Sequence, residues 1–157
     1  MNTKIFRFLI SIVMALIAGS LFGVGAQTVA GTIANGKATR GKAARATVTF
    51  TLPSELHVNS FKPGSEYAIP TTVKATAAGV KIGTVRYPAG ENRKFEFSEK
   101  SLNVYVGAVN FIFDVTVPAS YKGKSVKVNV AVRYQACTNE VCYPPKTKEV
   151  TLTAKVI

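Results

Sequence analysis

Apolar and polar residues alternate strictly along several short segments of the chain, as they do in β-strands with one buried face. One such segment places Val48, Phe50 and Leu52 on one side and three threonines on the other. No longer window repeats its apolar residues at the spacing of an amphipathic helix. The pattern therefore predicts an all-β fold, an immunoglobulin-like antiparallel β-sandwich of about seven strands. The strands are expected at residues 45–52, 67–75, 80–87, 95–97, 102–117, 126–134 and 150–156, with a bend at Gly107 and stops at Pro53 and Pro118.

The amino terminus carries the features of an export signal. Lys4 and Arg7 precede an apolar run at residues 8–18, and residues 24–26 (VGA) form the small-residue pattern of a cleavage site. The apolar run is short for a membrane span, which needs about 20 residues, although an uncleaved anchor is the alternative. We therefore expect a signal peptide at residues 1–26, a flexible lead-in rich in small residues at 27–45, and one domain at 46–157 in the periplasm.

The chain is strongly basic, with 20 lysines and arginines against 8 acidic residues and a formal net charge of +12. The net charge is still +10 when Lys4 and Arg7 of the leader are set aside. The basic residues are spread along the chain, and none of their runs interleaves with aromatic residues as a nucleic-acid stacking platform requires. No nucleic-acid partner is expected, and the charge is interpreted as a solvated surface with loose attraction to anionic envelope components.

The two cysteines, Cys137 and Cys142, lie in the connection between the last two alternating segments. An exported protein with an even number of cysteines is expected to pair them, and a hairpin brings them within disulfide distance. The odd-numbered residues of segment 126–134 face outward, so continued alternation predicts that Cys137 also faces solvent. Pro144 and Pro145 cannot donate backbone hydrogen bonds and are expected to end the pairing there.

The residues alone leave two interpretations of this pair open, a structural clip and a redox-active disulfide. The short loop would stabilise the fold by roughly 2 kcal/mol, against more than about 4 kcal/mol for a bridge between two sheets. An outward sulfur would also be open to attack by the thiolate of a partner. Zinc is not expected, because two cysteines and the single His57 cannot complete a four-ligand site.

The sequence around the cysteines resembles a known family. Residues 133–137 (RYQAC) and 142–147 (CYPPKT) are similar to the active-site hairpin of the N-terminal periplasmic domain of DsbD, the thiol:disulfide interchange protein, and residues 56–63 (LHVNSFKP) resemble a stretch of small bacterial members. The resemblance covers residues 46–156 and implies an immunoglobulin-like sandwich. It also implies a periplasmic dithiol–disulfide exchanger, linked to cytochrome c biogenesis, whose partners are thioredoxin-like proteins and a membrane thiol electron transporter.

The resemblance also implies roles for individual residues. Cys142 would form the mixed disulfide with a partner, and Cys137 would resolve it. Glu96 and Phe97 match a loop that shields the disulfide in the family, with a one-residue insertion, so Phe97 is the candidate cap. Its structural alternative is a core aromatic residue at the end of a strand. Phe95 stands where the family loop has an acidic residue, which puts carboxylate-assisted proton transfer in doubt.

Three further residues are candidates for lining the site. His57 and Asn59 lie in the segment that aligns with a site-lining stretch of the family, and Tyr143 follows Cys142 directly. His57 is expected at a strand end, hydrogen-bonded or solvated, near the cysteine hairpin. Tyr134 has the parity of a core residue and is expected to be structural. No cofactor and no metal are expected, and the domain is expected to be a monomer.

The chain also departs from the family pattern. Its cysteine loop is one residue shorter, and the membrane and thioredoxin-like domains of a full DsbD chain are not found in the sequence. A relay domain that depends on a separate protein for its reduction is therefore expected, and not an autonomous enzyme. The alternatives are a non-catalytic envelope binding module with a structural hairpin disulfide, and an assembly or chaperone-like protein that uses an exposed sheet edge.

Overall fold

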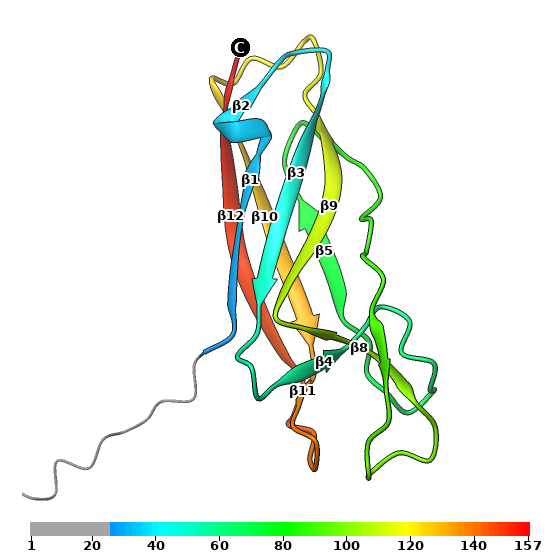
Figure 1. Ribbon diagram of the computed structural model, residues 1–157. Coiled ribbons are helices and arrows are strands. Elements are labelled where there is room, and N and C mark those ends of the chain that lie inside the picture. Colours follow the sequence, from blue (N-terminus) through cyan, green and yellow to red (C-terminus); the bar gives the residue numbers. More distant parts are fainter. Residues whose placement is uncertain (1–25) are drawn as a thin grey trace, which may run out of the picture.

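The structure is a computed structural model in which residues 26–157 are described. Within this range the backbone forms twelve β-strands in three four-stranded sheets (Figure 1). The strand pairs are antiparallel except that of β12 with β2, which is parallel. The strands are β1 (Thr28–Ile33), β2 (Lys37–Ala38), β3 (Ala43–Thr51), β4 (His57–Asn59), β5 (Thr72–Thr76), β6 (Lys81–Ile82), β7 (Glu91–Arg93), β8 (Leu102–Val106), β9 (Ala108–Thr116), β10 (Ser125–Tyr134), β11 (Ala136–Cys137) and β12 (Lys146–Val156), with a short 3-10 turn, η1 (Ala34–Gly36), after β1.

Two sheets of long strands enclose the main hydrophobic core. Their strand orders are β1-β3-β9-β6 and β2-β12-β10-β5. In β3 and β10 every second side chain is buried, and in β12 Leu152, Ala154 and Val156 are buried while Val150 is half-buried, which confirms the alternation predicted for these segments. Phe50 of the first sheet packs against Tyr134 of the second, with ring centroids 4.7 Å apart. The predicted all-β sandwich is thus confirmed, since apolar faces of both sheets meet in one core.

The third sheet, of order β11-β4-β8-β7, lies at one end of the sandwich and carries the cysteines (Figure 1). Two of the connections between this sheet and the sandwich consist of a single residue each. Between β8 and β9 the chain turns at Gly107, whose φ of 61° is rarely adopted by residues with a side chain. The predicted bend at Gly107 is therefore confirmed, and it separates two strands. Between β10 and β11 the chain turns at Gln135 and exchanges one set of partner strands for another.

The segment expected to be a flexible lead-in belongs to the sandwich. Its strand β1 pairs with β3 over its whole length, from Thr28 with Thr51 to Ile33 with Ala46. The expected domain boundary at residue 46 is therefore wrong. The small residues that suggested flexibility allow close packing, because a Cβ atom on Gly31 would lie 2.5 Å from the backbone oxygen of Thr47.

Several other strand predictions need correction. Segment 67–75 forms a strand only from Thr72, and segment 80–87 forms only the short β6 and an isolated bridge at Arg86. Residues 95–97 form a turn, while the neighbouring residues 91–93 form β7. The strands outnumber the expected seven partly because β4, β7 and β11 have only two or three residues each, too few to show an alternating pattern.

The predicted signal peptide, residues 1–26, lies outside the described residues except for its last position. Within the described range, no helix has the length and apolar character needed to cross a membrane.

Candidate functional site

The two cysteines form a disulfide across a tight hairpin that follows β11. The Cα atoms of Cys137 and Cys142 lie 4.0 Å apart. Backbone hydrogen bonds flank the bridge, from the Thr138 amide to the Val141 carbonyl (2.8 Å) and from the Tyr143 amide to the Ala136 carbonyl (2.9 Å). Because these bonds join backbone groups, they hold the two cysteines side by side whether or not the sulfurs are bonded to each other.

The hydroxyl of Thr138 stabilises the turn between the cysteines. Its Oγ1 accepts hydrogen bonds from the amides of Glu140 (3.2 Å) and Val141 (3.1 Å). Such side-chain bonds to the backbone two and three residues ahead favour a turn over extended structure. The hairpin is therefore locally specified by its own sequence.

The two cysteines differ sharply in exposure. Cys137 is 0% exposed, whereas Cys142 is exposed to solvent. The prediction that Cys137 faces outward is wrong. The alternation of β10 ends at Tyr134, and the chain then turns so that both residues of β11, Ala136 and Cys137, are buried against β4.

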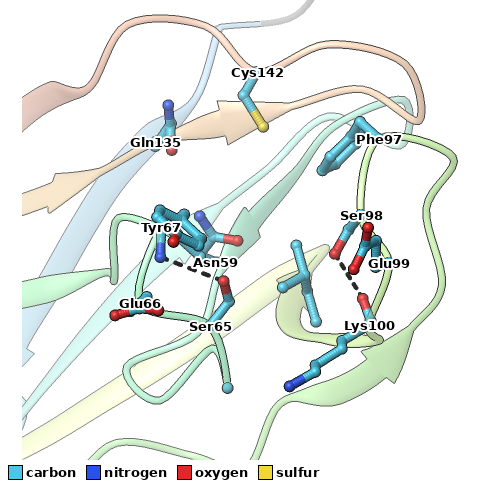
Figure 2. Close-up of a pocket in the computed structure, with 13 residues that line it drawn as sticks. Asn59, Ser65, Glu66, Tyr67, Phe97, Ser98, Glu99, Lys100, Gln135 and Cys142 are labelled. Atoms are coloured by element: carbon cyan, nitrogen blue, oxygen red, sulfur yellow. Dashed lines mark hydrogen bonds between the residues drawn. The ribbon is translucent and has the colours of Figure 1, made fainter.

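A pocket of about 720 Å³ opens beside Cys142. Figure 2 shows the Cys142 sulfur directed into it, with Phe97 on a neighbouring loop and Asn59 and Gln135 on its wall. The sequence pattern does not indicate residues 64–68 as part of the site, and it predicts a strand that begins at Tyr67. In the structure they form a loop along the pocket, and Tyr67 is 88% exposed.

The loop that carries Phe97 is held by stacking and by its own hydrogen bonds. Phe97 is 41% exposed and stacks on the buried Phe95 with ring centroids 5.1 Å apart. Lys94 donates hydrogen bonds to the carbonyls of Ser98, at 2.8 Å, and Glu99. The core aromatic residue of this segment is therefore Phe95, and Phe97 lies at the surface beside the pocket of Cys142.

The aromatic stack continues inward to His57. The rings of His57 and Phe95 lie 4.2 Å apart at an interplanar angle of 12°. His57 pairs with Cys137 across the β4–β11 ladder, so its expected position near the hairpin is confirmed. It is 3% exposed and its Nε2 has no hydrogen-bond partner, so the expectation of a solvated or hydrogen-bonded side chain is wrong for that nitrogen. Burial, and secondarily the charge of Arg93, lowers the pKa of His57 below 6.5.

Asn59 lies two residues further along β4, on the same face of the strand as His57. Its side-chain amide donates a hydrogen bond to the Ile69 carbonyl at 3.1 Å, while its buried Oδ1 has no partner. Asn59 lines the pocket of Cys142. One face of β4 thus presents a polar side chain to each half of the disulfide, His57 beside Cys137 and Asn59 toward Cys142.

The remaining candidate residues fall into two groups. Tyr143 is 45% exposed beside Cys142, whereas Tyr134 is buried in the sandwich core, as its parity predicted. Glu96 is exposed and lines a separate shallow opening with Glu140 and Arg93. Within residues 26–157, no three His, Cys, Asp or Glu side chains are grouped in a way that could hold a metal ion.

The comparison with known families decides how this site is classified. The family model described as "Thiol:disulfide interchange protein DsbD, N-terminal" matches residues 27–154. The chain belongs to this family. The match begins close to β1, which agrees with the folded position of the segment expected to be a lead-in.

Several known proteins are similar to this chain in sequence or in fold. The chain is 30% identical over 87 residues to the thiol:disulfide interchange protein DsbD of Actinobacillus pleuropneumoniae serotype 5b (strain L20), a match that covers 55% of this chain and 14% of that protein. The N-terminal periplasmic domain of ScsB from Proteus mirabilis has a similar fold, with a TM-score of 0.51, 12% identity and coverage of 81% of this chain and 44% of that one. The reduced DsbD N-terminal domain of Neisseria meningitidis matches with a TM-score of 0.46 and 20% identity, over 70% of this chain and 77% of that one.

Membership of the DsbD N-terminal family and the disulfide between Cys137 and Cys142 together support thiol–disulfide exchange as the general chemistry of this domain.

Proposed function

We propose that this protein is a periplasmic thiol–disulfide relay domain that passes electrons between thioredoxin-like partners through Cys137 and Cys142. The observation that carries the proposal is the unequal exposure of the two sulfurs. Cys142 is exposed in a pocket, while Cys137 is fully buried behind it. A disulfide of this kind has one sulfur that a partner can reach and one that is reserved for the internal step.

The exchange follows from this geometry. In the oxidising direction, the Cys142 thiolate attacks the disulfide of a partner, forms a mixed disulfide and releases one partner thiolate. The Cys137 thiolate then attacks the Cys142 sulfur, closes the intramolecular disulfide and releases the second partner thiolate. The hairpin backbone bonds keep Cys137 beside Cys142 during both steps, so the second attack is intramolecular and fast. The reverse sequence reduces the hairpin, and a membrane thiol electron transporter is the proposed source of those electrons.

The surface around Cys142 is suited to docking a protein. The described residues have six large hydrophobic side chains that are exposed, and four of them lie at this site. Tyr67 and Phe97 line the pocket, and Val141 and Tyr143 flank Cys142 in the hairpin. Aromatic residues are enriched in protein interfaces and charged residues are depleted from interface cores. The apolar collar formed by these four side chains would bury itself against a partner whose own cysteine approaches Cys142.

Phe97 is the proposed cap of the disulfide. It stands beside the pocket that contains Cys142, on a loop whose stacking partner Phe95 is anchored in the protein. A cap that moves away when a partner docks would limit reaction with small thiols and retain reaction with cognate proteins. The Phe97 ring is already partly exposed, and its movement would uncover only the face of Phe95 on which it stacks.

The competing function is a non-catalytic envelope module whose disulfide only holds the hairpin, and the buried sulfur of Cys137 is compatible with it. Equilibration of the domain in a series of dithiothreitol or glutathione redox buffers separates the two. A relay disulfide has a potential within reach of physiological dithiols, whereas a potential well below about −300 mV identifies a structural clip.

Trapping the mixed disulfide tests the relay directly. In the Cys137→Ala variant, Cys142 should accumulate a mixed disulfide with an envelope thioredoxin-like protein, because no second cysteine can resolve it. The matched control is Cys142→Ala, in which the remaining buried cysteine should trap far less partner. If neither variant captures a partner under conditions where the hairpin is reduced, the relay function is wrong.

A further inference from the structure

His57 lies opposite the buried half of the disulfide in the third sheet. His57 and Cys137 are directly opposite each other in the antiparallel β4–β11 pair. Side chains of such a pair project from the same face of a sheet, with Cβ atoms about 5 Å apart. The imidazole is held in place by the stack on Phe95, at 4.2 Å. The ring is therefore positioned beside Cys137 by both the strand ladder and the aromatic stack.

The environment of His57 is unusual for a structural histidine. Within the described residues only two buried side-chain nitrogen or oxygen atoms have no hydrogen-bond partner, and one is Nε2 of His57. A neutral imidazole carries one donor and one acceptor nitrogen, and burying either without a partner costs free energy. Such an unpaired group beside a redox-active sulfur needs an explanation, because packing alone would be satisfied by a phenylalanine.

The chemistry of Cys137 supplies that explanation. When the disulfide is open, Cys137 is a thiol in a position that is 0% exposed in the closed form, and burial disfavours its thiolate. Closing the disulfide requires that thiolate, so the thiol must lose its proton at a place that water does not reach. A neutral imidazole opposite the thiol can take the proton.

We propose that His57 is the proton-transfer residue for Cys137 in the intramolecular step, an inference that rests on the proposed relay function. The His57 Nε2 accepts the Cys137 thiol proton as the Cys137 sulfur attacks the Cys142 sulfur. The Cys137–Cys142 bond forms, the bond from Cys142 to the partner sulfur breaks, and the electron pair leaves with the partner thiolate. The imidazolium then releases its proton to solvent. In the reverse direction the imidazolium protonates Cys137 as it leaves.

The charges around His57 favour the neutral base. Arg93 of β7 acts on it and disfavours the imidazolium, in the same direction as burial. The partner of His57 on β8 is the uncharged Val106. Lys94, Glu96 and Glu140 lie with Arg93 around an exposed opening, where solvent screens their charges. The base is thus unprotonated at neutral pH and ready to accept a proton.

The test uses the reduced full chain and a small aromatic disulfide whose released thiolate is coloured. Wild-type protein should release one thiolate when Cys142 attacks and a second when Cys137 closes the disulfide, so stopped-flow absorbance resolves the two steps. His57→Phe keeps a ring to stack on Phe95 but has no base. We expect it to leave the first phase unchanged and to slow the second by about 10²-fold, the usual contribution of general acid–base catalysis. Cys137→Ala reports the first phase alone.

The pH dependence of the second phase is the decisive readout. In the wild type its rate should fall as the pH drops through the pKa of His57, below 6.5, and level off above it. In His57→Phe the rate should instead keep rising with pH, because it then follows the thiolate fraction of the buried Cys137. A second phase of the same rate and the same pH profile in both proteins would overturn the role of His57 and leave the relay intact. Absence of the first phase in the wild type would overturn the relay itself.

A measurement on the wild type covers the case in which the variant does not fold. His57 is the only histidine of the chain, so its ring resonances in untagged protein can be assigned without ambiguity. In reduced protein these resonances should report two coupled titrations, that of His57 and that of Cys137, whereas the oxidised protein should show only one. Identical titration curves in the two states would overturn the proposal.

Discussion

Reducing the disulfide should cost this domain little stability, and the size of the effect follows from the hairpin. Cys137 and Cys142 are separated by 5 positions in sequence, so the bridge closes one of the shortest loops a disulfide can form. In the chain-entropy model a loop of this length stabilises the folded state by about 2 kcal/mol. Domains of this size have unfolding free energies of about 5–15 kcal/mol, so the reduced form remains folded.

The structure around the bridge supports this estimate. The backbone bonds of Thr138 with Val141 and of Tyr143 with Ala136 do not depend on the sulfurs, nor do the side-chain bonds of Thr138. Residues 138–145 of the hairpin belong to no strand of the two sandwich sheets. A domain that cycles between dithiol and disulfide needs this property, because its reduced form must keep the same docking surface.

The assay is urea unfolding with and without excess dithiothreitol. A loss of about 2 kcal/mol should lower the midpoint by about 1 M urea, with little change in slope. By the thermodynamic cycle, the same 2 kcal/mol lowers the potential of the folded disulfide by only about 40 mV relative to the unfolded chain. The double variant with both cysteines replaced by alanine is the control and should match the reduced wild type. A loss above about 4 kcal/mol, or unfolding on reduction, would refute the reasoning and identify the bridge as a structural clip.

Three further predictions concern the site. Phe97→Ala should speed reduction of the disulfide by small thiols several-fold, followed with dithiothreitol, while Phe61→Ala, another exposed aromatic outside this pocket, should not; equal rates in both variants would remove the case for a cap. In single-cysteine variants Cys142 should be alkylated at least about tenfold faster than Cys137, measured by mass spectrometry, because thiol reactivity requires access. Burial lowers the pKa of folded His57, so the unfolded state binds more protons below about pH 6.5 and the folded state should lose stability as the pH drops through that range. Urea midpoints measured at about pH 7.5 and pH 5 should therefore fall less in His57→Phe than in the wild type. Equal falls in the two proteins would contradict a lowered pKa of His57.

Local sequence determined much of the fold and the pairing of the two cysteines. Alternation over β3, β10 and β12 depends only on which side chains prefer water, so it identified the strands that build the sandwich. Gly107 marked the bend because few other residues adopt its backbone conformation. The hairpin motif located the cysteines and indicated the family to which the chain belongs.

Contacts between distant segments decided the rest. The sequence of residues 27–45 suggests a flexible segment, yet β1 is a strand because its backbone pairs with that of β3. Gly31 lies so close to the Thr47 backbone that a larger residue would not fit there. Short strands such as β4 carry no periodic signal and exist only through their neighbours in the sheet. Sequence periodicity cannot reveal these pairings, since it records one chain segment at a time.

The exposure of the two sulfurs shows most clearly which features the sequence determined and which the tertiary structure determined. The sequence by itself determined that Cys137 and Cys142 meet across a hairpin, because they lie close together in the connection between two alternating segments. It predicted the wrong face for Cys137, because alternation holds only while a strand keeps the same partners. Before Gln135 the chain pairs with β12 and β5, and after it the chain pairs with β4. Because of this change of partners, Cys137 is buried opposite His57, while Cys142 lies at the pocket. Which sulfur is open to a partner was therefore decided by the tertiary structure alone.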